Sequence, residues 1–174
     1  EKSLIHSNIS SYGGAISVFY PDSEVNINES TIFGNSDGIS IYSDEANATI
    51  SNSIFWSDQN DDVIVNINNI GNIDLKYSNI KGGWEGEGNI DADPIFLDPS
   101  NGDYSLNPTS PCIDTGDPDS DLDPDGTRAD MGAYPFFQVP GCIDTFSCNY
   151  SQEATINDGS CIYDCYPYGD YVLG

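Results

Sequence analysis

The sequence predicts an all-β protein whose main part is a parallel β-helix, with three short strands in each coil of about 23 residues. Three observations support this fold class. The first 80 residues repeat with a period near that length, each repeat holds three runs of alternating β-branched residues, and Gly, Asn, Asp and Ser separate the runs. A single coil cannot bury its inward side chains, so stacked coils must share one continuous core.

The first series of strand-like runs is marked by isoleucines in Ser/Asn-rich phrases. These are Ile9, Ile32, Ile54 and Ile80, at spacings of 23, 22 and 26 residues. We expect the four side chains to stack as an internal ladder. Polar residues beside them should lie at or next to turns, where their side chains bond backbone groups: Asn8, Ser30, Asn52 and Asn79.

Two further series complete the predicted coil. One comprises residues 15–18, 39–41 and 63–65, and the other residues 25–27, 48–50 and 72–75. Leucine-rich repeats have a similar period, but this chain has few leucines. The main alternative is a β-sandwich, which would not require three parallel registers at one period.

The charge balance restricts the partners of the chain. It carries 29 acidic residues against 4 basic ones, a net charge of -25. This excludes a nucleic-acid binder and disfavours anionic membranes, and no apolar run is long enough for membrane insertion. Divalent cations are the natural partners of such a surface. Hydrophobic residues at 37% and aromatic residues at 11% favour a folded chain over a disordered one.

An acidic turn between residues 114 and 130 resembles a cation-binding loop. Residues 121–126 match the first half of a calcium loop, with carboxylates at alternate positions before Gly126, although Gly132 stands where an EF-hand has its closing Glu. The alternative is a solvated acidic loop in which Arg128 pairs with one Asp. The first calcium candidate comprises Asp117, Asp119, Asp121, Asp123, Asp125 and Asp130.

Five cysteines indicate an oxidising compartment. Cys142, Cys148, Cys161 and Cys165 lie within 24 residues of one another and predict disulfides in a secreted, extracellular or cell-surface protein. Zinc is the competing interpretation, but the sequence has no CxxC pair and its one histidine, His6, is distant. We expect Cys112 to be a buried free thiol, with a bridge as the alternative.

The sequence divides into two predicted domains, coils and a closing segment at 1–137 and a small cysteine-rich module at 138–174. The module is too short for a sufficient core, so crosslinks should stabilise it. Its oxygen donors form a second calcium candidate, although Asx residues also favour turns without any ion. The donors are Asp144, Asn149, Asn157 and Asp158.

Residues 88–134 carry a long, specific phrase. It runs through Asp-Ala-Asp-Pro (91–94), Gly-Asp-Tyr (102–104), Ser-Pro-Cys-Ile-Asp (110–114) and Arg-Ala-Asp-Met-Gly-Ala-Tyr (128–134). This phrase resembles the end of bacterial exported proteins of the pectate-lyase-like superfamily. The resemblance covers about residues 1–137, and it implies right-handed coils that this segment closes.

Residues 141–161 resemble short cysteine modules of secreted proteins from marine bacteria and some algae. The shared pattern is Gly-Cys-Ile-Asp, Cys-Asn-Tyr and Asp-Gly-Ser-Cys. The resemblance implies the pairs Cys142–Cys161 and Cys148–Cys165, among the three connectivities that four cysteines allow.

The function expected from these features is a non-catalytic structural or adhesive module of a larger secreted, cell-surface or filament-forming protein. Calcium and disulfides would stabilise it. The chain opens in mid-repeat, so we expect it to be a piece of that protein. Its basic and histidine side chains are too scattered for a lyase site: Lys2, Lys76, Lys81, Arg128 and His6. The alternative is the C-terminal part of a β-helical polysaccharide lyase or hydrolase whose active site lies in upstream coils.

Carbohydrate, or other copies or modules of the same large protein, are the macromolecular partners that the sequence suggests. Trp56 and Trp84 are the candidate sugar contacts. Aromatic residues in such folds more often fill corners or the core, so packing inside the fold is the alternative to sugar binding for these two residues.

Overall fold

The computed structural model describes residues 2–10, 14–36, 38–57, 64–66 and 72–165. The chain divides into two compact units, Glu1–Phe136 and Phe137–Gly174. The regular structure in the described residues is strand, apart from one short 3-10 turn at Pro99–Asn101.

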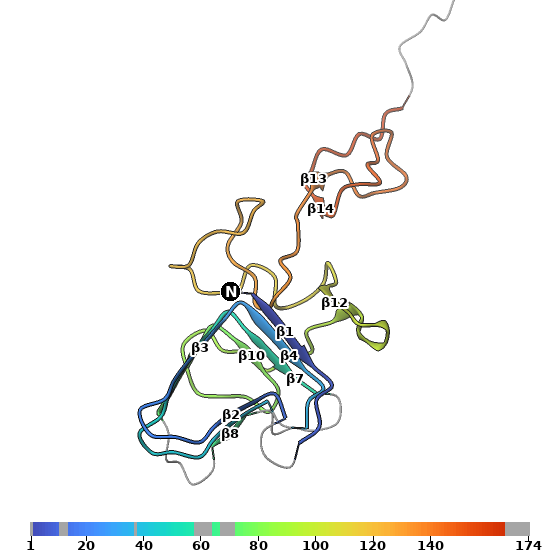
Figure 1. Ribbon diagram of the computed structural model, residues 1–174. Helices are drawn as coiled ribbons and strands as arrows, with labels where there is room; N and C mark the ends of the chain where they lie inside the picture. The colour runs from blue at the N-terminus through green and yellow to red at the C-terminus, as the bar shows by residue number, and fades with distance from the viewer. Residues whose placement is uncertain (1, 11–13, 37, 58–63, 67–71, 166–174) are drawn as a thin grey trace, which may run out of the picture. The chain divides into compact units, whose positions relative to one another are not determined.

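Three parallel sheets form the main part of the first unit (Figure 1). The first sheet contains β1 (Ser3–His6), β4 (Ser30–Phe33), β7 (Ile54–Trp56) and β10 (Asn79–Ile80). The second sheet contains β2 (Ile16–Val18), β5 (Ile39–Ile41) and β8 (Ile64–Asn66). The third sheet contains β3 (Glu24–Asn28), β6 (Asn47–Ser51) and β9 (Asn72–Lys76).

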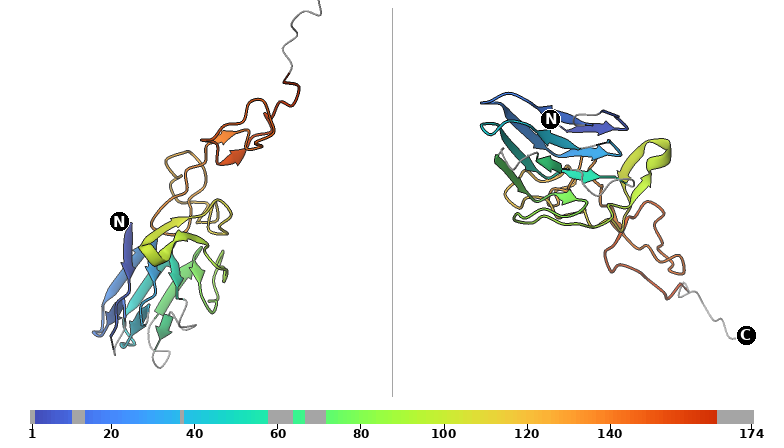
Figure 2. Two further views of the ribbon diagram at one scale, coloured as in Figure 1. Left: turned by 90° about the vertical axis from the view of Figure 1, so that its right-hand side faces the viewer. Right: turned by 90° about the horizontal axis from the view of Figure 1, so that it is seen from below.

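The chain visits the three sheets in turn and returns to each sheet one strand further along (Figure 2). Neighbouring strands pair in parallel, as in Ile16↔Ile39↔Ile64 and Ile27↔Ile50↔Leu75. The prediction of an all-β fold with three parallel strand series is therefore confirmed, and the antiparallel pairing of a sandwich is not what these sheets contain.

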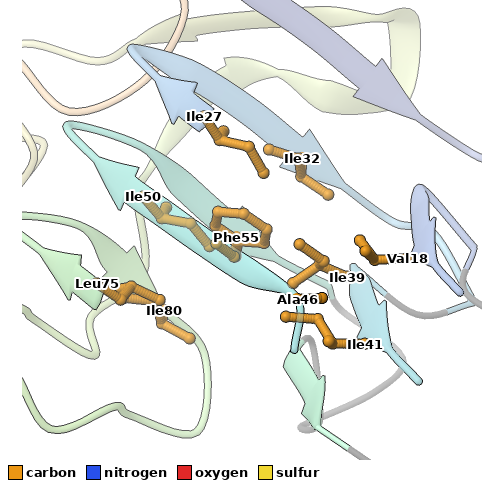
Figure 3. Close-up of a cluster of buried hydrophobic side chains, with 11 residues drawn as sticks. Val18, Ile27, Ile32, Ile39, Ile41, Ala46, Ile50, Phe55, Leu75 and Ile80 are labelled. Carbon is orange, nitrogen blue, oxygen red and sulfur yellow. The ribbon is translucent and has the colours of Figure 1, made fainter. Parts of the chain in front are cut away.

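The core lies between the three sheets (Figure 3). One passage of the chain through the three sheets is called a coil below, as a description of the strand order alone. Alternate strand residues point inward, so one buried side chain stacks on its register partner in the next coil. Val18 lies beside Ile41, and Ile27, Ile50 and Leu75 form a column in the third sheet. Successive coils thus bury one another's β-branched side chains. This burial of apolar surface is the favourable free energy that stabilises the short strands.

The isoleucine ladder predicted for the first sheet is wrong at two of its four positions. The inward column runs Ile5, Ile32, Phe55 and Ile80. Ile9 follows β1 and is 94% exposed, while Ile54 points to the outer face. A shift of one residue turns a strand side chain to the opposite face, which is why Phe55 replaces Ile54.

A serine column stabilises the corner between the third and first sheets. Ser30 N–H donates to Ser53 Oγ at 3.2 Å, and Ser53 N–H donates to Ser78 Oγ at 3.1 Å. The residue before each serine has a left-handed backbone, with φ of 46° at Glu29, 48° at Asn52 and 46° at Tyr77. Each coil therefore turns with the same geometry, and the buried serine hydroxyls satisfy backbone groups that the turn leaves unpaired.

Residues 81–92 cover the end of the core that lies next to β9 and β10. Trp84 packs against the core cluster, and Asn89 Nδ2 donates to the carbonyl of Leu75 at 2.9 Å. A side chain at Gly86 would collide with that same carbonyl. The end of the third sheet is thereby closed by side-chain and backbone groups instead of a further strand.

An aromatic cluster joins the first sheet to an antiparallel hairpin, β11 (Phe96–Asp98) and β12 (Asp103–Leu106). Phe33 and Phe96 meet edge to face with their ring centroids 5.6 Å apart, and Tyr104 lies 5.0 Å from Phe33. This arrangement of rings is favourable beyond the area it buries.

The segment after the hairpin, residues 107–136, is called the closing segment below, and it packs on the outer face of the first sheet. Met131 and Cys112 are buried against Ile54, and Ala133 N–H donates to Thr31 Oγ1 at 3.0 Å. Gly132 has φ of 109°, and a Cβ there would lie 2.8 Å from Ile54 Cδ1. Only glycine permits this close approach.

Alanine substitutions at two isoleucines test the corrected register. Ile32→Ala should lower the unfolding free energy by about 2–5 kcal/mol because it leaves a cavity in the core. Ile9→Ala should change it by less than about 0.5 kcal/mol because the side chain is exposed. Urea unfolding measures both values, and a larger loss for Ile9→Ala would contradict the register.

Candidate functional site

The first calcium candidate does not form one converging set of carboxylates. Asp123 and Asp130 are buried, Asp117 and Asp125 are half-buried, and Asp119 and Asp121 are exposed. Within the described part of the chain, no three or more His, Cys, Asp or Glu side chains are grouped so that they could hold a metal ion. Calcium at this turn stays a prediction.

The two buried carboxylates bind backbone N–H groups. Asp130 Oδ1 accepts from Asp114 N–H at 2.7 Å, and its Oδ2 accepts from Phe136 N–H at 2.6 Å. Asp123 Oδ2 accepts from Asp130 N–H at 2.7 Å. These charge-assisted bonds connect the start, middle and end of the closing segment.

Burial raises the pKa of both carboxyl groups. Desolvation raises the pKa of Asp130 to about 6, although its two backbone donors act in the opposite direction. Desolvation likewise raises the pKa of Asp123, against the hydrogen bond from Asp130 N–H and the charge of Lys2. Burial therefore makes the charged form of both carboxylates less favourable. Backbone N–H groups of the closing segment partly offset this cost by donating hydrogen bonds to them.

Asx turns shape the more exposed part of the acidic turn. Asp117 Oδ1 accepts from Asp119 N–H at 2.9 Å, and Asp125 Oδ1 accepts from both the N–H and the hydroxyl of Thr127. Arg128 donates to the carbonyls of Gly116 and Thr115. The alternative prediction was that Arg128 pairs with an Asp. In the structure, Arg128 instead donates to these two backbone carbonyls.

Asn52 is the residue that joins this turn to the coils, and sequence reasoning placed it only near a turn. Its side chain is fully buried. Oδ1 accepts from Asp117 N–H at 2.6 Å, Nδ2 donates to Ser120 Oγ at 2.8 Å, and the backbone carbonyl accepts from Gly132 N–H at 2.8 Å. One corner residue thus satisfies three separate groups of the closing segment.

The corners above and below Asn52 also contact the closing segment. Lys2 Nζ lies 2.8 Å from Glu29 Oε2 and 3.7 Å from Asp123 Oδ1. Arg128 lies over the ring of Tyr77 at 5.9 Å. The acidic turn therefore runs along three consecutive coils, and each contact fastens a different one.

Cys112 is a buried free thiol. Its Sγ accepts a hydrogen bond from Asn79 Nδ2 at 3.1 Å, and burial raises its pKa to about 11. A thiol with so little thiolate at neutral pH is a poor nucleophile and metal ligand.

Two disulfides crosslink the second unit. Cys142 pairs with Cys161 and Cys148 with Cys165, with Cα–Cα distances of 4.9 Å and 5.3 Å. This is the connectivity that the resemblance implied. The unit also contains one short parallel pair, β13 (Pro140–Gly141) and β14 (Ile156–Asn157).

The oxygen donors of the second calcium candidate accept hydrogen bonds within the second unit. Asn149 Oδ1 accepts from Ile162 N–H, Asn157 Oδ1 accepts from Gly159 N–H, and Asp158 Oδ1 accepts from Ser160 N–H. Asp144 bonds Phe146 N–H and the Tyr163 hydroxyl. The bonds from Phe146, Gly159 and Ser160 N–H are local Asx turns, whereas those from Ile162 and Tyr163 join segments distant in sequence. Calcium at these residues stays a prediction.

The candidate sugar contacts lie apart from each other. Trp84 covers the core, whereas Trp56 lies on the outer face of the first sheet against the cluster of Ile54 and Cys112. The ring of Trp56 has Lys81 Nζ 5.5 Å from its centroid. The two rings are not brought together as one sugar-stacking platform.

Comparison with family models, with curated proteins and with solved structures gives no match. Among the described residues, the structure has no apolar helix of membrane-spanning length.

Removing the Asn52 side chain should loosen the closing segment. Asn52→Ala leaves Asp117 N–H and Ser120 without their partner, so we expect a loss of about 1–3 kcal/mol. It should also expose Cys112, which a thiol reagent will then label faster in the folded protein. Asn26→Ala, on an exposed position of β3, is the matched control. Equal labelling rates in both variants would contradict the role of Asn52.

Asp130 should make stability depend on pH. Its pKa in the folded protein lies above the ordinary 3.8, so the folded state binds more protons between the two values. With chelator present, the thermal midpoint should therefore rise as the pH falls from about 7 to about 5. Desolvation also raises the pKa of the neighbouring Asp123, so this carboxylate acts in the same direction.

Two variants separate the contribution of Asp130. Asp130→Asn should lower the midpoint at every pH and reduce its pH dependence, whereas Asp121→Asn, at an exposed position, should keep the wild-type dependence. An unchanged slope in Asp130→Asn would show that burial of this carboxylate does not set the pH dependence.

Proposed function

We propose that this chain is a non-catalytic structural module of a larger secreted or cell-surface protein. In this proposal, the described residues between 2 and 92 belong to coils of a right-handed parallel β-helix. The support is the strand order, with one strand per sheet in each coil and parallel pairing throughout the three sheets. Crossover connections between parallel strands are almost always right-handed.

The single observation that carries this function is the contact of the closing segment with three consecutive corners. Glu29 is reached through Lys2, Asn52 directly and Tyr77 through Arg128. Coils in a stack contact only their neighbours, so a segment that spans several coils opposes their separation. A rigid stalk or an adhesin-like or filament-forming protein needs this resistance.

The second unit supports placement outside the cell. Its described residues bury little apolar surface, and two disulfides constrain the chain in place of a core. Such crosslinks persist in oxidising compartments. The resemblance to exported bacterial β-helix proteins and to cysteine modules of secreted proteins agrees with this proposal.

An activity measurement tests the non-catalytic assignment. The full chain, incubated with polygalacturonate, alginate and a neutral polysaccharide, should release neither unsaturated uronate nor reducing ends. Release that Lys76→Ala or His6→Ala abolishes would contradict the proposal and favour a polysaccharide lyase or hydrolase.

Calcium is a proposed stabiliser, and it is tested separately. A ligand that binds only the folded state raises stability by about 2.7 kcal/mol at one hundred times its dissociation constant. Thermal unfolding with calcium should therefore have a higher midpoint than with chelator, and the double variant Asp119→Asn, Asp121→Asn should reduce the difference. Identical midpoints would remove calcium from the proposal and leave the structural role intact.

A further inference from the structure

The second unit exposes large apolar side chains on two segments. Ile143 is 45% exposed and Phe146 88%, while Ile162 is 53% and Tyr163 62% exposed. Cys142 is the buried residue among the described positions of this unit, so the exposed side chains have no core to join. Exposed apolar groups that gather in this way mark interaction sites in soluble proteins.

The two segments lie side by side. Cys148 N–H donates to the carbonyl of Ile162 at 2.8 Å, and the Tyr163 hydroxyl donates to Asp144 Oδ2 at 2.9 Å. The other oxygen of Asp144 accepts from Phe146 N–H at 2.9 Å. A half-buried carboxylate is thus bound by one exposed aromatic residue from each segment, and the two disulfides hold this arrangement in place.

Charge decides what this surface accepts. Residues 137–174 contain five acidic residues and no Lys, Arg or His, in a chain of net charge -25. A second copy of the chain would be repelled, and so would an anionic membrane or an acidic polysaccharide. A carboxylate beside exposed aromatic rings instead favours a Lys or Arg side chain, through an ion pair and a cation–π contact.

We propose that residues 143–146 and 162–163 form a docking surface for a basic and apolar segment of another protein. A Lys or Arg of the partner binds at Asp144, and its apolar residues cover Phe146 and Tyr163. This proposal goes beyond the structural role and concerns the second unit alone.

Defined peptides test the proposal on the full chain. Fluorescence anisotropy compares a labelled peptide of alternating Leu and Lys with a Gly and Lys peptide of equal length and charge. The Leu/Lys peptide should bind at least tenfold more tightly, because only it combines charge with apolar contact. Phe146→Ser should weaken its binding about tenfold and leave the Gly/Lys peptide little changed. Asp144→Asn removes the carboxylate that binds Lys, so it should weaken the Leu/Lys peptide about tenfold and weaken the Gly/Lys peptide as well.

A matched control uses an exposed apolar residue of the first unit. Leu122 is 62% exposed, and Leu122→Ser should bind the Leu/Lys peptide as the wild type does. Intact mass without reductant shows that each variant retains both disulfides. The proposal would be overturned if the two peptides bound with equal affinity, or if neither bound. It would also be overturned if Leu122→Ser weakened binding of the Leu/Lys peptide as much as Phe146→Ser does, or if vesicles of neutral phospholipid competed with the peptide.

Discussion

Attachment of the closing segment to the corner residue Asn52 is the interaction on which the rest of the first unit depends. Each strand has only a few residues, so the coils rely on the shared core and on contacts that span several coils. Asn52 is fully buried, and its side chain and carbonyl bond Asp117, Ser120 and Gly132. These bonds bring Met131 and Cys112 onto Ile54, which gives the first sheet an apolar outer layer as well as an inner one.

The acidity of the chain therefore has two roles. On the surface it gives a strongly negative field, which is the basis for the cationic partners that we propose. In the closing segment, Asp123 and Asp130 are buried and bind backbone N–H groups, which organises a segment with few regular hydrogen bonds. The cost of burying those charges appears as a raised pKa in both groups.

The fold class was predictable because strand periodicity and turn residues recur along the chain. The register of the first sheet was not predictable from the isoleucines. Ile9 and Ile54 lie in Ser/Asn-rich phrases like those of Ile32 and Ile80, but their side chains do not point inward. The signal that identifies the inward position is Ser-x-Ile or Ser-x-Phe, beginning at Ser3, Ser30, Ser53 and Ser78, which pair or bond from coil to coil. Asn52 could not be recognised as the central contact, since its partners in the closing segment lie more than 60 residues away in sequence. Likewise, the backbone N–H partners of Asp123 and Asp130 could not be predicted from the alternating carboxylates, because these contacts form only in the folded chain.

Native-state hydrogen exchange tests the central claim most directly, since it measures how often individual N–H groups open. The N–H groups of Asp117, Gly132 and Ala133 bond Asn52 and Thr31. If the closing segment is an integral layer of the coils, these three should exchange as slowly as the amides of β4 and β7, and all should accelerate together in Asn52→Ala. Fast exchange of the three N–H groups beside protected strands would show that the closing segment is only loosely attached, and would contradict the account.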